Sequence, residues 1–154
     1  MFENILVAVD GSAHSKKAMS YAVELAEKFG ASIMLIHVYS AILPIIPATD
    51  ALTSATVAAP ASAAVAAKIA EDARKLGEKI LEDSEKIVKE HGIPVEKVLR
   101  EGDAVKEIVA EARKGGFSLV VIGHRGLSKL SELLLGSVSE GVGHKAPCSV
   151  MIVK

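Results

Sequence analysis

The residues best suited to chemistry form a glycine-rich segment in the last third of the chain. Its glycines are Gly123, Gly126 and Gly136, and Ser137 follows the last of them directly. Glycine has no Cβ and permits positive φ, so its backbone can turn tightly against a bulky ligand. Arg125, between the first two glycines, can reach an anion. These residue types and this spacing indicate a loop that holds a polyphosphate.

A second phosphate-binding feature is expected where the last helix of the chain begins. The helical pattern covers residues 137–145, and Ser137 with Glu140 fits a capping box. The start of a helix offers unpaired N–H groups and about half a positive charge. The backbone of four residues would form this anion site: Gly136, Ser137, Val138 and Ser139. A purely structural alternative stays open. Glycines after a strand often form simple turns, and the role of Ser137 can be limited to capping its helix.

Asp10 is the acidic residue best placed to contact a sugar. It ends the apolar run NILVAVD, and a carboxylate at the carboxyl end of a strand can accept hydrogen bonds from ribose hydroxyls. It can also help to hold Mg²⁺ through water, because that ion keeps several waters and shares phosphate oxygens. The sequence Asp10-Gly11-Ser12 is equally typical of a turn before a helix, so both roles remain open.

Other catalytic and metal-binding patterns are not found in the sequence. No two of the five histidines have the i, i+4 spacing of a zinc-enzyme helix. The single cysteine, Cys148, excludes an internal disulfide and a cysteine-built zinc site. Neither the Walker pattern nor the dinucleotide GxGxxG pattern is present, which argues against a motor-type nucleotidase and a redox Rossmann enzyme. Of the histidines, only His124 lies near the proposed site, and His37 is expected to be a half-buried strand residue with a hydrogen-bond partner.

Composition limits the function further. The chain has 154 residues, of which 50% are hydrophobic and 24% charged, and its net charge is −1. This length and composition predict one globular domain over residues 1–154 and argue against a disordered chain or a nucleic-acid-binding protein. The N-terminus has no basic region typical of a signal peptide, and residues 41–67 contain Asp50 and three prolines, which disfavour a membrane-spanning helix. We therefore expect a cytoplasmic protein that binds no membrane.

Alternating strand and helix patterns must position these residues. Strands are predicted at 4–10, 32–39, 95–100, 117–122 and 149–153, with helices at 18–29, 68–91, after Asp103 and at 137–145. This alternation predicts an α/β fold of the Rossmann-like type: an open five-stranded parallel sheet in the order 3-2-1-4-5, with helices on both faces. Ligands bind such sheets at the carboxyl ends of strands where the winding reverses. The site is therefore expected just after Val9 and just after Ile122.

Two segments carry further expectations. The helix over residues 68–91 is amphipathic, with an apolar stripe that we expect to be its buried face: Ile69, Ala73, Leu76, Ile80 and Ile87. Residues 40–65 are rich in Ala, Ser, Thr and Pro and almost free of charge. This composition predicts a long excursion, with a helical end over residues 61–67 and the apolar residues of 42–46 packed on the domain or on a partner.

The glycine–two residues–glycine–nine residues–glycine–serine spacing resembles the ATP-binding branch of the universal stress protein family. The segments ILVAVDGS, EGDAVKEIV and PCSVMIVK are also similar to that family, so the resemblance covers nearly the whole chain. It implies an open five-stranded α/β domain that is usually a homodimer. It also implies that Asp10, preceded by Ala8 and Val9, lies near the ribose, and that the backbone at Val38 contacts adenine. The phosphates would then lie on Gly123, Gly126 and the start of the last helix, whereas the roles of His124 and Arg125 are less defined because the family varies there.

The last strand, Ser149 to Val153, is predicted to be an exposed apolar edge. We therefore expect a two-fold homodimer in which the two edge strands pair antiparallel. Three functions remain open at this stage. The chain can be an ATP-binding regulator of an unknown downstream protein in a stress response, which we favour. It can instead be a slow Mg-dependent ATPase or phosphotransferase, or a stress scaffold whose pocket is vestigial.

Overall fold

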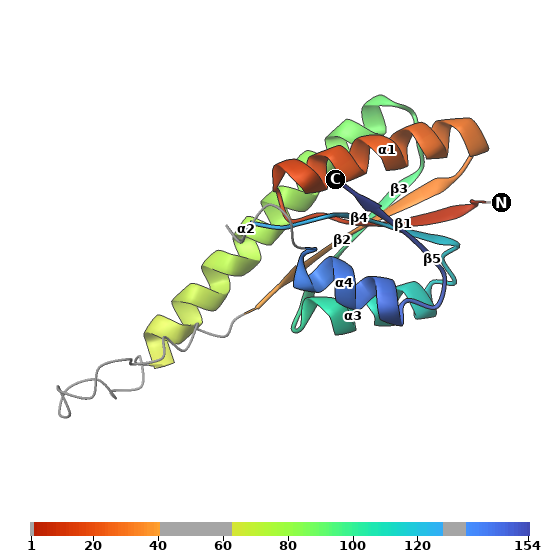
Figure 1. Ribbon diagram of the computed structural model, residues 1–154. Helices are drawn as coiled ribbons and strands as arrows, with labels where there is room; N and C mark the ends of the chain where they lie inside the picture. Colours follow the sequence, from red (N-terminus) through yellow and green to blue (C-terminus); the bar gives the residue numbers. More distant parts are fainter. Residues whose placement is uncertain (1, 41–62, 128–134) are drawn as a thin grey trace.

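The computed structural model describes residues 2–40, 63–127 and 135–154 (Figure 1). The strands and helices alternate along the chain as the sequence predicts. They are β1 (Asn4–Ala8), α1 (Ala13–Phe29), β2 (Ser32–Tyr39), α2 (Ala63–Glu90), β3 (Val95–Glu101), α3 (Ala104–Lys114), β4 (Leu119–Gly123), α4 (Ser137–Lys145) and β5 (Ser149–Val153).

The five strands form one parallel sheet in the order β3-β2-β1-β4-β5, which confirms the predicted order. In its register Ala8 of β1 lies between Ile36 of β2 and Ile122 of β4. Helices α1 and α2 cover one face of the sheet, and α3 and α4 cover the other (Figure 1). The winding therefore reverses between β1 and β4, where the site is expected.

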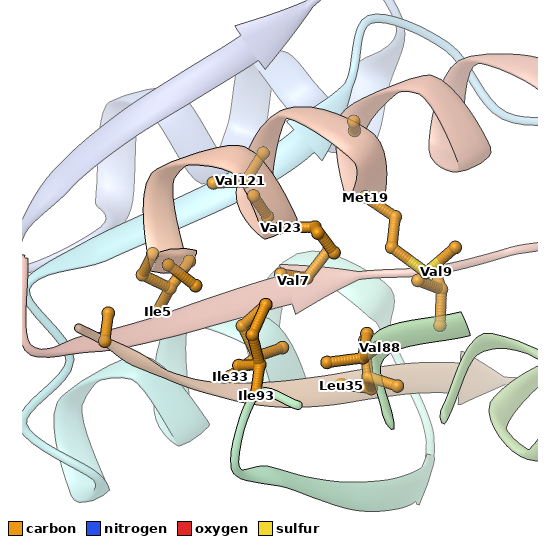
Figure 2. Packing of buried hydrophobic residues seen from close by; sticks show 14 of the residues in the cluster. Ile5, Val7, Val9, Met19, Val23, Ile33, Leu35, Val88, Ile93 and Val121 are labelled. Carbon is orange, nitrogen blue, oxygen red and sulfur yellow. The ribbon is translucent and has the colours of Figure 1, made fainter. Parts of the chain in front are cut away.

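Each face of the sheet has its own apolar core. In β1, Ile5 and Val7 point toward α1 and α2, whereas Leu6 and Ala8 point toward α3 and α4. Figure 2 shows the first core, in which Val23 of α1 packs near Val7 and Val121. Because β1 is buried on both faces, it reads as a continuous apolar run, as the central strand of a parallel sheet does.

Two helix boundaries follow directly from local chemistry. Helix α1 begins after Ser12, whose hydroxyl oxygen accepts a hydrogen bond from the Ser15 N–H at 3.2 Å. It ends at Gly30, which adopts a left-handed conformation with φ of 66°. Helix α3 begins after Asp103, whose carboxylate accepts from the Lys106 N–H at 2.9 Å. The predicted end of the first helix at residue 29 and the predicted start of a helix after Asp103 are confirmed.

Helix α2 buries the predicted apolar stripe only in part, because Ile80 packs against the core but the most buried residues lie on the adjacent side of the helix. Leu76 and Ile87 of the predicted stripe are 57% and 41% exposed, whereas Leu81 and Val88 are buried against the sheet. Gly77 decides this orientation, because a Cβ there would lie 2.6 Å from Cδ2 of His37 and 2.8 Å from a methyl group of Leu99. The helix thus approaches the sheet with its smallest residue, and the predicted apolar stripe lies to one side of that contact.

Most of the predicted excursion, including residues 42–46, lies outside the described residues. Helix α2 begins at Ala63, within the range 61–67 where a helical end was expected. Within the described ranges, no helix is both long enough and apolar enough to cross a membrane. The assignment of residues 1–154 to a single domain stays a prediction.

Candidate functional site

A cavity of about 490 Å³ opens at the carboxyl end of the sheet, where β1 and β4 diverge toward opposite helices. All eleven residues predicted to contact a ligand line it: Ala8, Val9, Asp10, Val38, Gly123, Arg125, Gly126, Gly136, Ser137, Val138 and Ser139. They come from four separate segments of the chain. The structure therefore brings the predicted residues together, while their contact with a ligand stays a prediction.

One carboxylate oxygen of Asp10 holds the turn at Asp10–Ser12, and the other lies beside Gly126 in the segment that follows β4, called the glycine loop. Its Oδ1 accepts a hydrogen bond from the Ser12 N–H at 2.9 Å, which is the turn interaction that the sequence left open. Its own N–H donates to Oγ of Ser15 at 3.1 Å. Its Oδ2 lies so close to Gly126 that a Cβ on this glycine would be 2.5 Å away. The turn thus fixes Asp10 beside the loop that follows β4.

The three glycines of the motif serve close approach rather than positive φ. Among the described residues, the glycines with positive φ do not include Gly123, Gly126 or Gly136, so the expected use of positive φ is wrong. A Cβ on Gly123 would lie 2.7 Å from the carbonyl carbon of His14, and one on Gly136 would lie 2.9 Å from the carbonyl oxygen of His124. Gly123 and Gly136 therefore each allow two backbone segments to pack closely beside the cavity. Gly126 allows the Asp10 carboxylate to do so.

The start of α4 has no side-chain cap. Gly136, not Ser137, is the N-cap residue, so the predicted capping box of Ser137 and Glu140 is wrong by one position. Oγ of Ser139 lies 2.9 Å from the His124 carbonyl oxygen and 2.8 Å from that of Gly136, and so donates back toward the loop. Because they belong to the first turn of the helix, the N–H groups of residues 137–139 have no intrahelical acceptor. Their partial positive charge is directed at the cavity.

Hydrogen bonds join the backbone of residues 124 and 125, which follow β4, to three neighbouring elements. The Gly136 N–H donates to the His124 carbonyl at 3.0 Å, and the His124 N–H donates to the Val153 carbonyl at 2.6 Å. The Ser12 hydroxyl donates to the Arg125 carbonyl at 3.4 Å. These contacts join the ends of the loop to the start of α1, the start of α4 and the edge strand β5.

The side chain of His124 lies beside the cavity rather than in its lining. Its ring is buried, and its centroid is 6.1 Å from that of His14. Burial lowers the pKa of His124, and the positive charges of Arg125 and Lys154 and the ring of His14 lower it further. The imidazole is therefore held toward its neutral form.

The backbone of Val38 faces the cavity at the end of β2. The Ile33 N–H donates to the carbonyl of Pro94, just before β3, and the Tyr39 carbonyl accepts from the N–H of Gly102, just after β3. Odd-numbered residues of β2 therefore face β3. The Ile36 carbonyl accepts from the Val9 N–H, so even-numbered residues face β1. Because β1 ends at Ala8, the N–H and C=O of Val38 extend past it without a partner in the parts of the chain that the structure describes. One donor and one acceptor thus face the crevice side by side.

Sequence reasoning missed several residues of the lining. His37 and Tyr39 flank Val38 on β2, and α2 contributes apolar side chains that include Leu76 and Ile80. The Tyr39 hydroxyl donates to Oε2 of Glu101 at 3.1 Å, and partial burial together with this bond raises the pKa of Tyr39. His37 and Tyr39 could have been found from their position at the end of a strand. Leu76 and Ile80 could not have been found in this way. Whether they line the cavity depends on which side of α2 faces the sheet, and that side is the one that carries Gly77.

The family model for the universal stress protein family matches residues 1–154. This chain belongs to the universal stress protein family. It is 37% identical over 154 residues to Universal stress protein YxiE of Bacillus subtilis, with 100% of each chain covered. These matches confirm the resemblance that the glycine spacing and the three flanking segments indicate.

Solved structures of this family share the fold. Universal stress protein UspA from Lactobacillus plantarum superposes with a TM-score of 0.81 at 21% identity, covering 99% of this chain and 98% of that one. A family member from Arabidopsis thaliana, described with AMP bound, has a TM-score of 0.65 at 23% identity and coverages of 99% and 91%. The universal stress protein from Archaeoglobus fulgidus in complex with dAMP has a TM-score of 0.67 at 20% identity and coverages of 100% and 98%. Nucleotides are thus ligands of some structural neighbours.

Proposed function

We propose that this chain is an ATP-binding regulatory protein of a stress response, with the nucleotide in the crevice between β1 and β4. The observation that carries the proposal is the convergence of four distant segments on one cavity that the uncapped start of α4 faces. The AMP and dAMP complexes of its structural neighbours support the same class of ligand. Binding would favour one arrangement of the backbone at Gly126 and at the start of α4, and so favour one surface for a downstream protein.

The phosphates would lie between the glycine loop and the start of α4. Three peptide N–H groups there have no intrahelical acceptor, and a helix start attracts anions through these groups and through its dipole. Gly126 and Gly136 add no side chain that would separate a phosphate from the backbone. The cavity of about 490 Å³ falls within the range of small-molecule sites, about 300–1,000 Å³.

The sugar and the base would lie toward β1 and β2. Asp10 can accept hydrogen bonds from ribose hydroxyls, because only one of its oxygens is engaged by the turn. Val38 offers one N–H and one C=O, which match an acceptor and a donor on the edge of adenine. Leu76 and Ile80 of α2 give this part of the cavity an apolar wall, as is usual for a site that holds a planar ring.

Mg²⁺ would be held chiefly by the phosphates. Within the described ranges, no three His, Cys, Asp or Glu residues come together in a way that could hold a metal ion. Asp10 is the carboxylate that lines the cavity, and Mg²⁺ usually binds through one or two carboxylates with substrate phosphates and waters. The residues present therefore fit a Mg²⁺ that arrives with ATP.

The direct test is mass spectrometry of nucleotide released from freshly purified, denatured protein, followed by calorimetric titration with ATP. Wild type should release or bind an adenine nucleotide. Gly126→Val should bind it at least about tenfold more weakly, because its Cβ would displace Asp10, and tenfold corresponds to about 1.4 kcal/mol. Gly143→Ala is the matched control, since a Cβ there meets only a methyl of Ile152 at 3.7 Å. Equal affinity in wild type and Gly126→Val would overturn the proposal.

The same preparation distinguishes a regulator from a slow Mg-dependent ATPase or phosphotransferase. Phosphoryl transfer requires little beyond positioning and charge stabilisation, and Asp10 beside the glycine loop is placed to assist it. Tight binding without release of phosphate supports the regulator. Turnover that Asp10→Asn abolishes would assign the enzyme instead.

We further propose a homodimer formed through β5. This strand is an edge of the sheet, and its central residues Val150, Met151 and Ile152 are only half-buried. A partly exposed apolar edge strand can pair with a copy of itself about a two-fold axis. Sedimentation at micromolar concentration should give a dimer, and a monomer would reject this part of the proposal.

A further inference from the structure

His37 of β2 makes a hydrogen bond at the point where the β1–β2 ladder stops. Its Nδ1 lies 2.6 Å from the carbonyl oxygen of Val9, and the residue is 8% exposed. A carbonyl oxygen can only accept, so Nδ1 must carry the proton and donate. This bond fixes both the tautomer and the position of the ring within the lining of the cavity.

The Val9 carbonyl is the group that the next ladder bond would use. In a parallel pair, one residue donates its N–H to one residue of the neighbouring strand and accepts through its C=O from the residue two positions further on. The Val9 N–H donates to the Ile36 carbonyl at 2.9 Å, so its carbonyl would ordinarily accept from the Val38 N–H. The His37 ring makes that bond instead, and the Val38 N–H is left to face the cavity.

We propose that His37 is a positioning residue for the nucleotide base. By occupying the Val9 carbonyl it stops the ladder one bond early, and so keeps the N–H and C=O of Val38 available to a base edge. The inference rests on the proposed function and goes beyond it by naming the residue that holds the base-binding backbone open.

Helix α2 holds the ring in this position from the other side. A Cβ on Gly77 would lie 2.6 Å from Cδ2 and 3.1 Å from Nε2 of His37, so only glycine leaves room for the imidazole there. The ring is thus confined between the Val9 carbonyl and the backbone of α2. A side chain of similar size that cannot donate a hydrogen bond would fill the same space. The Val9 carbonyl could then accept a hydrogen bond from the Val38 N–H.

The test compares His37→Leu with His37→Asn by hydrogen exchange and by binding. The Val38 amide should exchange rapidly in wild type and in His37→Asn, whose side-chain amide can donate to the Val9 carbonyl as Nδ1 does. In His37→Leu the Val38 amide should become protected. AMP should bind His37→Leu about tenfold more weakly, about 1.4 kcal/mol, whereas ribose 5-phosphate, which has no base, should bind both variants as it binds wild type.

Two outcomes would overturn the inference in distinguishable ways. If AMP binds wild type and His37→Leu equally and the Val38 amide of wild type is protected, the role of His37 is wrong while nucleotide binding stands. If neither AMP nor ribose 5-phosphate binds wild type, the proposed function is wrong and the inference falls with it. A further test needs no variant, because nitrogen-15 NMR spectra of wild type show which ring nitrogen of His37 carries the proton. The proton should be on Nδ1. A proton on Nε2 alone would contradict the proposal.

Discussion

Two helices begin at the same crevice, and their starts are built in opposite ways. At the start of α1, the Ser12 hydroxyl accepts from the Ser15 N–H, and Asp10 accepts from the Ser12 N–H. At the start of α4, the N-cap residue is Gly136, and no side chain caps the helix. The first start has a side-chain cap, whereas no side chain in the described part of the chain caps the second.

This difference agrees with the proposed phosphate site at the start of α4. The Ser12 hydroxyl stabilises the α1 start as its cap, and the bond from the Ser12 N–H fixes Asp10 at the rim of the cavity. Ser139 of α4, which could have capped a donor, instead directs its hydroxyl to the carbonyls of His124 and Gly136. We infer that α1 provides stability and α4 provides the anion site, and that substitutions at the two starts should have different consequences.

The largest effect is expected for Ser137→Glu. A carboxylate on the first residue of α4 would repel a bound phosphate, so affinity for ATP should fall about ten- to hundredfold, about 1.4–2.7 kcal/mol. The same charge favours the positive end of the helix, so stability should rise by about 0.3–1 kcal/mol. Calorimetric titration and urea unfolding check the two signs. Ser137→Gln is the control of equal size, and an equal loss of affinity in Ser137→Gln would remove charge as the cause.

Gly123→Ala should cause the next largest effect, and it acts on the α1 start. Its Cβ would meet backbone atoms of His14 and Ser15 at 2.7 and 2.9 Å, which cannot move without displacing the helix. Overpacking of this kind costs about 1–3 kcal/mol, measured as a lower free energy of unfolding in urea. Gly143→Ala, inside α4, should instead stabilise the protein by up to about 1 kcal/mol, because its Cβ would make only an ordinary contact of 3.7 Å with a methyl group of Ile152. Destabilisation of equal size by both would contradict the close approach at Gly123.

Removal of the two serine hydroxyls compares the helix starts directly. Ser12→Ala deletes the cap of α1 and should lower the free energy of unfolding by about 0.5–2 kcal/mol. Ser137→Ala deletes no cap and should change it by less than about 0.5 kcal/mol. Thermal and urea unfolding of the two variants provide the measurement. A loss for Ser137→Ala as large as that for Ser12→Ala would restore the capping box that the structure rejects.

The smallest effect concerns pH. The pKa of His124 is lowered in the folded protein, first by burial and then by nearby positive charges, so the unfolded chain binds this proton more readily. Stability should therefore fall as pH drops below about 6.5, the usual pKa of an unfolded histidine, and level off below the folded pKa. His124→Gln should show a shallower loss between pH 7 and pH 5 in urea titrations. An unchanged slope would assign the acid sensitivity to other groups.

Much of this arrangement could be predicted from the sequence. The strand order and the position of the site follow from alternation and handedness, because the carboxyl ends of parallel strands meet at one edge. Asp10 and the glycine motif consequently fall on one cavity without any knowledge of side-chain contacts, whereas Val38 was predicted from the resemblance to the family.

The errors have local physical causes. The capping box was one residue out of place because sequence cannot show whether Ser137 is the cap or the first helical residue. The buried face of α2 was only partly right because the helix has apolar residues on two adjacent sides, and the side that carries Gly77, Leu81 and Val88 lies closest to the sheet. The predicted cytoplasmic location, the homodimer and the stress role stay predictions.

The most direct test of the account is an amide NMR titration of the labelled protein with ATP. The N–H signals of Ser137, Val138 and Ser139, together with that of Gly126, should shift on saturation, because these groups would receive the phosphates. The N–H of Ser15, already engaged by the Ser12 hydroxyl, should move little by comparison. Saturable binding that leaves the amides of residues 137–139 unshifted would contradict the claim that the uncapped start of α4 is the phosphate site.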